Sequence, residues 1–194
     1  NATMPDGIVY INQPQILKVS GDPAILDTDP LGFSAKISVD LYYKDSEKPE
    51  YLDLVVVKNS DAKNAKVIKA KISTYPTEVE VDGKLLTDLF GTIASGDSYD
   101  FGTNYIVGGK TYVAFPEGGG PGYGGGPASQ PNSSPTVRYS AICGFVVDDF
   151  LGDGKFEVTV DGWEDFGVES IANVTKIDES TLEIVYSIPS FKPI

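Results

Sequence analysis

The stretch Phe33-Ser-Ala-Lys-Ile-Ser-Val-Asp-Leu-Tyr-Tyr43 decides the fold class of this chain. Its apolar residues at alternate positions are Phe33, Ala35, Ile37, Val39, Leu41 and Tyr43, with the polar residues Ser34, Lys36, Ser38 and Asp40 between them. An extended chain places alternate side chains on opposite faces, whereas no helix keeps this apolar set on one side. The stretch therefore predicts a half-buried β-strand.

Further strand candidates follow one another along the N-terminal part, separated by turn residues. They are residues 8–11, 15–19, 52–58, 66–72, 77–81, 99–107 and 110–115. Pro14 suits a kinked edge strand, and Gly108-Gly109 suits a two-residue hairpin between the last two candidates. Short strands spaced by about 8–12 residues are typical of a sandwich, so we predict an immunoglobulin-like β-sandwich over residues 1–117.

One segment of this part departs from the strand pattern. The apolar spacing of Leu85-Leu-Thr-Asp-Leu-Phe90 fits a single helical turn between two strands. We expect this turn to plug one end of the sandwich.

Residues 118–135 are rich in glycine and proline, and we interpret them as a linker or loop. Residues 136–194 resume the β pattern, with strand candidates at 136–147, 155–160, 170–176 and 181–188. So short a segment makes a thin core. These strands either dock on the first domain or belong to an incomplete antiparallel β module. The predicted class is thus all-β throughout.

The charge of the chain excludes several partners. The formal net charge is −13 and Arg138 is the sole arginine, so phosphate clamps for nucleic acid are missing. An anionic membrane surface is disfavoured for the same reason. No apolar run approaches the roughly 18 residues of a transmembrane span.

Histidine is absent from the sequence. Ser-His-Asp and Cys-His catalysis, and zinc sites that use imidazole, are therefore excluded. We expect no enzymatic activity and no cofactor. Cys143 is alone and follows Ala141-Ile142, which predicts a small buried side chain rather than a reactive thiol.

Five lysines crowd one predicted hairpin: Lys58, Lys63, Lys66, Lys69 and Lys71. They could form a basic recognition patch. We favour the interpretation that they keep an exposed sheet edge from pairing with other chains.

The C-terminal segment is strongly acidic, with 11 acidic and 4 basic residues over 136–194. The densest part holds Asp148, Asp149, Asp153, Glu157, Asp161, Glu164, Asp165 and Glu169. Calcium prefers such ligands, but the spacing does not match a calcium-binding loop, so we favour a solvated face and expect no metal. The adjacent Glu164 and Asp165 point to opposite faces of a strand, which argues against a glycosidase pair.

Trp163 is the only tryptophan and lies in the acidic turn Asp161–Gly167. An aromatic face beside carboxylates is the combination that saccharides need. The candidate ligand-binding residues are therefore Trp163 with Asp161, Glu164 and Asp165, and Tyr123 in the glycine-rich stretch. The alternative is that Trp163 covers the core of the C-terminal module.

Several stretches resemble a known group of proteins. The first set is Leu54–Asn59, Tyr75–Val81, Leu85–Gly91 with Gly96-Asp97 and Tyr99, and Phe115–Gly119 with Gln130-Pro131 and Ser140–Cys143. The second is Gly154–Val158 with Asp161, Trp163 and Asp165-Phe166. They are similar to lipoproteins of gut Bacteroidetes with an N-terminal immunoglobulin-like domain, like the starch-utilisation E-type outer-membrane proteins.

This resemblance implies a protein of the outer membrane, at the cell surface or on the periplasmic face, lipid-anchored through a cysteine upstream of Asn1. The implied function is non-catalytic support of glycan binding and uptake, with a polysaccharide or an outer-membrane uptake-complex protein as partner. The alternative function is a structural or adhesive protein-interaction module without sugar binding. The resemblance supplies no binding residues, and the anchoring cysteine does not lie within the sequence.

Overall fold

The computed structural model describes residues 11–119, 129–144, 151–160, 168–178 and 181–186. The chain forms two compact units, Asn1–Gly144 and Phe145–Ile194. Strands make up most of the described secondary structure in both, which confirms the all-β prediction.

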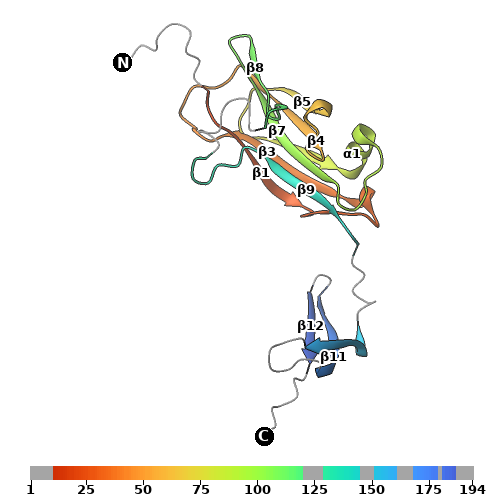
Figure 1. Cartoon of the computed structure of the whole chain (residues 1–194). Helices are drawn as coiled ribbons and strands as arrows, with labels where there is room; N and C mark the ends of the chain where they lie inside the picture. The colour runs from red at the N-terminus through yellow and green to blue at the C-terminus, as the bar shows by residue number, and fades with distance from the viewer. Residues whose placement is uncertain (1–10, 120–128, 145–150, 161–167, 179–180, 187–194) are drawn as a thin grey trace. The chain divides into compact units, whose positions relative to one another are not determined.

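One sheet of the first unit contains three antiparallel strands in the order β1-β3-β6. The neighbouring strands β1 and β3 are labelled in Figure 1. They are β1 (Pro14–Gly21), β3 (Ser34–Leu41) and β6 (Thr77–Asp82). β1 begins at a proline, whose missing N–H is tolerated at the first position of an edge strand.

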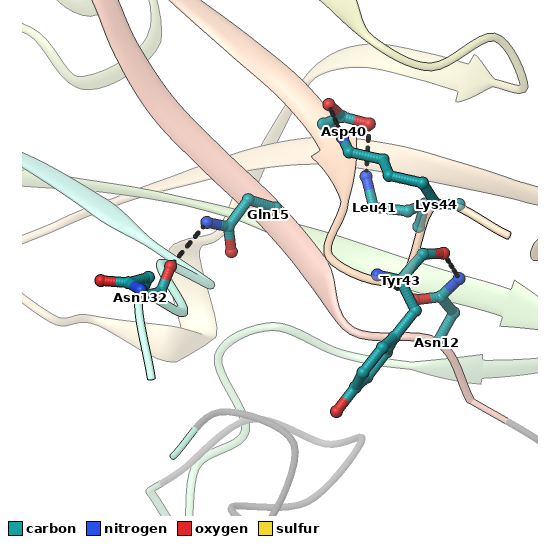
Figure 2. Close-up of polar contacts among 7 residues, drawn as sticks. All are labelled: Asn12, Gln15, Asp40, Leu41, Tyr43, Lys44 and Asn132. Carbon is teal, nitrogen blue, oxygen red and sulfur yellow. Dashed lines mark hydrogen bonds and ion pairs between the residues drawn. The ribbon is translucent and has the colours of Figure 1, made fainter. Parts of the chain in front are cut away.

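β3 confirms the strand expected from the alternating pattern, but it ends before Tyr43. Phe33 and the alternate residues from Ala35 to Leu41 are buried, whereas Tyr43 is 38% exposed. The chain turns at this point because the Asn12 side chain binds the Tyr43 backbone, donating to its oxygen at 2.9 Å (Figure 2).

The second sheet has the order β2-β9-β7-β4-β5, and β8 pairs with β7. Its strands are β2 (Ile25–Leu26), β4 (Tyr51–Lys58), β5 (Lys66–Ile72), β7 (Ser98–Val107), β8 (Lys110–Tyr112) and β9 (Val137–Ile142). Gly108 and Gly109 both have positive φ, which confirms the predicted two-residue hairpin between β7 and β8.

The two sheets face each other and share one core, so the first unit is a β-sandwich. The β3 residues Ile37 and Val39 pack in the same cluster as Leu54 of β4 and Phe101 of β7. Tyr139 of β9 packs against two other aromatic residues of the core, with its ring 5.2 Å from Phe33 and 5.8 Å from Phe101, both edge-on. Aromatic pairs of this geometry add about 0.5–1.5 kcal/mol each beyond area burial.

The predicted helical turn is the helix α1 (Gly83–Phe90). The Asp82 side chain caps it by accepting a hydrogen bond from the Leu85 N–H at 2.7 Å. Leu86 is fully buried in the core cluster, and Gly83 lies against the Pro30 carbonyl of the short 3-10 helix η1 (Pro30–Gly32). The helix thus follows β6 and precedes β7 along the chain, as expected, and Leu86 packs into the core. That the helix plugs one end of the sandwich stays a prediction.

The predicted boundary before residue 136 is wrong. β9 (Val137–Ile142) hydrogen-bonds with β7 and contributes Tyr139 and Ala141 to the core, so the first unit continues to Gly144. The division of the chain therefore does not fall in the glycine-rich stretch.

The described end of that stretch, residues 129–135, is fastened to the first sheet. The Gln15 amide nitrogen donates to the Asn132 carbonyl at 2.9 Å (Figure 2), and the Ser134 N–H donates to the Gln15 side-chain oxygen at 2.8 Å. The Ile16 N–H donates to the Ser134 carbonyl at 2.7 Å, and the Tyr42 hydroxyl to the Pro131 carbonyl at 2.6 Å. This segment covers part of the free edge of β1 and leads the chain into β9.

The second unit contains a three-stranded antiparallel sheet in the order β10-β11-β12. The strands are β10 (Gly152–Val160), β11 (Val168–Asp178) and β12 (Thr181–Tyr186). Val174 on the central strand is 3% exposed.

Candidate functional site

A cleft of about 320 Å³ lies on the outer face of the second sheet, away from the core. Its floor contains Val57 of β4 and the cross-strand partner of Val57, Asp100 of β7. On the other side Asp100 pairs with Arg138 of β9, which lies beside the cleft and not in its lining. The lining residues are Val57, Ser60, Ala62, Asp100, Ala114, Phe115, Pro116, Gly119, Pro135 and Thr136.

Asp100 and Arg138 form a two-point ion pair at this floor. The Nε and Nη2 groups of Arg138 donate to the two carboxylate oxygens of Asp100 at 2.7 and 2.9 Å. The pair raises the pKa of Arg138, chiefly through its hydrogen bonds to Asp100. The Asp100 side chain is 11% exposed and that of Arg138 is 55% exposed. The carboxylate is therefore held in one orientation, while the guanidinium remains open to solvent.

One wall of the cleft is the segment that follows β8. It leaves the strand ladder because the Ala114 N–H donates to the Asn104 side-chain oxygen at 3.0 Å. The Phe115 ring then lies against Gly102 of β7, where any side chain would collide with it. The missing side chain at Gly102 thus lets an aromatic ring approach the sheet.

The opposite wall is the turn between β4 and β5, which contains the 3-10 helix η2 (Ala62–Asn64). Asn59 and Ser60 both have positive φ, and the Asp61 side chain accepts from the Lys63 N–H. Lys63 Nζ lies 3.8 Å from a Glu117 carboxylate oxygen, so an exposed ion pair joins the two walls. Such exposed pairs contribute about 0–1 kcal/mol, so this contact is weak.

A polar network anchors this turn to the loop before β7. Lys58 Nζ lies 2.8 Å from Asp97, and the Asn59 amide donates to the same carboxylate at 2.9 Å. Burial alone would raise the pKa of Asp97, but the bonds from Lys58, Asn59 and the Ala94 N–H lower it below its usual value. The ionised Asp97 therefore stabilises the base of the second wall.

The predicted ligand-binding residues Trp163, Asp161, Glu164, Asp165 and Tyr123 lie outside the described residues. The side chains of all eight residues in the densest part of the acidic segment, Asp148 to Glu169, also lie outside the described ones. The cleft residues Asp100 and Phe115 were not predicted as a site, nor was Arg138, the ion-pair partner of Asp100. The sequence offered one signal for this ion pair, namely that Arg138 is the sole arginine. Its partner Asp100 could not be identified from the sequence, because it lies 38 residues away.

The cysteine prediction is wrong. Cys143 is exposed, and its sulfur lies 3.2 Å from the Ser95 hydroxyl. The alternation that buries Tyr139 and Ala141 does not extend to Cys143, because β9 ends at Ile142. The edge position of the lysines is confirmed for Lys66, Lys69 and Lys71, since β5 is the terminal strand of its sheet.

A second hollow, of about 340 Å³, lies beside η1. Two carboxylates line it, but each already accepts a backbone hydrogen bond: Asp22 from the Ser34 N–H and Asp29 from the Gly32 N–H. Their arrangement is explained by the turns that they hold.

In the part of the chain that the structure describes, no three cysteine or carboxylate side chains come together as a metal site. The described helices also include none that is long and apolar enough to span a bilayer. Comparisons with protein-family models, curated proteins and solved structures find no match to this chain.

Proposed function

We propose that the chain is a non-catalytic cell-surface lipoprotein module that supports glycan binding, and that the outer-sheet cleft receives one sugar unit. The observation that carries this proposal is the cleft itself. Its volume of about 320 Å³ is at the lower end of the range of about 300–1,000 Å³ for small-molecule sites.

The lining of the cleft supports a sugar as the ligand. A sugar ring presents C–H groups on its faces and hydroxyls at its edge, so its site needs both apolar and polar surfaces. Phe115 and Pro135 provide apolar surface, and Asp100, Ser60 and Thr136 provide oxygen atoms for the hydroxyls.

The carboxylate content of the cleft favours binding over hydrolysis. Glycosidases need two carboxyl groups on either side of the scissile bond. Asp100 is the one carboxylate among the residues that line the cleft, and both of its oxygens already accept bonds from Arg138.

The strand order supports the immunoglobulin-like interpretation of the sandwich. β3 and β6 pair in one sheet and β4, β7 and β9 in the other, which corresponds to the B–E and C–F–G arrangement of that fold. The lipid anchor and outer-membrane location depend on the family resemblance. A signal peptide ending in a lipid-attachment cysteine, in the upstream genomic sequence, is the observation that tests them.

Affinity electrophoresis of the whole chain in gels containing soluble polysaccharides tests the cleft. Thr136 is exposed at the rim, so Thr136→Trp should fill the cleft and abolish retardation by the glycan that retards the wild type. Thr92→Trp, at an exposed position outside the cleft, should leave retardation unchanged. If no polysaccharide retards the wild type, the proposal is wrong.

The predicted residues around Trp163 provide a second candidate contact group. Trp163→Ala in the same gels tests it separately. If the glycan still retards Thr136→Trp but no longer retards Trp163→Ala, the proposed site lies in the C-terminal unit and not in the cleft.

A protein-interaction module remains the second candidate function, and the edge strands favour it. Leu17 and Val19 on β1 are 46% and 48% exposed, and Val67 on β5 is 53% exposed. Exposed apolar side chains on terminal strands are suited to pairing with another chain. Two results together would favour this function. The wild type would capture an outer-membrane partner that Val67→Lys fails to capture, and no glycan would retard the wild type.

A further inference from the structure

The charge of the cleft constrains which sugars it can hold. Asp100 is the one charged residue among those that line it, and the two-point pair with Arg138 neutralises that charge. The whole chain carries a net charge of −13, which repels polyanions at long range. A neutral glycan therefore approaches and occupies the cleft without an electrostatic penalty.

The same ion pair presents an acceptor beside a donor. Each Asp100 oxygen receives one N–H from Arg138, and a carboxylate oxygen can accept more than one hydrogen bond. The Nη1 group of Arg138 makes no hydrogen bond to the described residues, and the side chain is 55% exposed. The guanidinium thus retains N–H donors next to a carboxylate that retains lone pairs.

We infer that the cleft selects a neutral sugar unit with two free adjacent hydroxyls, one donating to Asp100 and its neighbour accepting from Arg138. This inference rests on the proposed glycan-binding function and assigns its ligand class. The Phe115 wall accommodates the apolar face of the same ring.

Arg138 lies beside the cleft rather than in its lining, so it positions Asp100 and meets the sugar only at the edge next to that carboxylate. Its planar fork fixes the plane of the carboxylate, which an ammonium group on a flexible stem cannot do. The carboxylate also disfavours acidic sugars, because a uronate or sulfate close to Arg138 would lie beside the negative charge of Asp100.

The first experiment uses the unmodified whole chain. Amylopectin, galactomannan and xyloglucan serve as neutral probes, and polygalacturonate and chondroitin sulfate as acidic probes, in affinity electrophoresis. We expect retardation by at least one neutral glycan and by neither acidic glycan. Per-O-methylation of the retained neutral glycan should abolish retardation, because methylation removes hydroxyl donors and leaves the charge unchanged.

The second experiment compares Asp100→Asn, Arg138→Gln and Arg138→Lys, with circular dichroism to verify folding. Asp100→Asn should weaken neutral-glycan binding by about tenfold, consistent with one charge-assisted hydrogen bond, and it should gain retardation by polygalacturonate, because Arg138 is then unneutralised. Arg138→Gln should weaken neutral-glycan binding. Arg138→Lys should weaken it to the same extent, because a lysine side chain cannot form the two-point contact with Asp100.

The outcomes distinguish failure of the proposed glycan-binding function from failure of the inferred ligand class. No retardation of the wild type by any glycan overturns the proposed function, and the inference with it. Retardation by polygalacturonate, or by the methylated glycan as strongly as by the unmodified one, overturns the inference alone. The methylation result decides the inference even where a variant fails to fold.

Discussion

The ring of Phe115 lies directly over Gly102, so closely that a Cβ atom on this glycine would come within 2.8 Å of the Phe115 Cζ atom. Glycine inside a strand ordinarily weakens it, and often marks the close approach of another group. Here it permits the segment after β8 to lie against the sheet and to form a wall of the cleft.

Gly102→Ala is expected to displace Phe115 and to lower the free energy of unfolding. Overpacking of this kind costs about 1–3 kcal/mol. Urea denaturation monitored by circular dichroism measures the change. Gly118→Ala is the matched control, because a Cβ at Gly118 meets nothing within 4 Å. Equal stability of the two variants would contradict the close packing at Gly102.

Asp97→Asn is expected to lower the free energy of unfolding at pH 7 by about 1.5–3 kcal/mol, the range for hydrogen bonds to charged groups. Because the pKa of Asp97 is lowered in the folded protein, its stabilisation is present above the unfolded pKa of about 3.9 and is lost as the pH falls through the folded value. The difference between wild type and variant should therefore shrink as the pH falls from about 5 towards 2.

Urea unfolding at pH 7, 4 and 2.5 measures this dependence. Asp88→Asn serves as the control, because Asp88 pairs with Lys84 at a position where both side chains are more than half exposed, and solvent screening leaves such pairs little effect on stability. A difference between Asp97→Asn and the wild type that stays constant with pH would show that the pair does not titrate as described.

Thr103→Val is expected to leave the fold unchanged and to raise the free energy of unfolding by up to about 1 kcal/mol. Thr103 is fully buried, and its hydroxyl has no hydrogen-bond partner among the described residues. Replacement of an unpaired buried hydroxyl by a methyl group of similar volume removes a desolvation cost. Thermal and urea unfolding measure the change.

The comparison variant is Thr87→Val in α1. The Thr87 hydroxyl donates to the Gly83 carbonyl at 2.8 Å, so the same substitution removes a bond and should destabilise by about 0.5–1.5 kcal/mol. Destabilisation by both Thr103→Val and Thr87→Val would argue that the Thr103 hydroxyl has a hydrogen-bond partner in solution.

Truncation distinguishes the two domain boundaries. A fragment of residues 1–144 should fold, with a cooperative thermal transition, because it contains all strands of the first unit. A fragment of residues 1–117 should lack a cooperative transition, because it loses β9 and with it Tyr139 and Ala141 of the core. Cooperative melting of the shorter fragment would restore the boundary predicted from the sequence.

Local patterns predicted much of this fold. The alternation around Ile37 and Val39 predicted a strand that the structure confirms, and the bounds of β5 agree at both ends. The helix α1 and the Gly108-Gly109 turn were also predicted. Each of these features depends on residues close together in sequence, so periodicity and turn chemistry suffice to find it.

The features that were missed depend on residues far apart in sequence. Asp100 and Arg138 become neighbours only when β7 pairs with β9, and no pattern within either segment indicates this pairing. The glycine-rich stretch suggested a domain boundary, but the hydrogen bonds of Gln15 to residues 132 and 134 fasten its far end to the first sheet. The predicted contacts around Trp163 stay a prediction.

The late position of β9 has a consequence for how the chain is made. Synthesis proceeds from the N-terminus, and the strand that pairs with both β2 and β7 is the last of the first unit to emerge. Until then the aromatic residues Phe33 and Phe101 lack their common neighbour Tyr139. The second sheet of the nascent first unit therefore stays one strand short until the glycine-rich interval and β9 have both been synthesised.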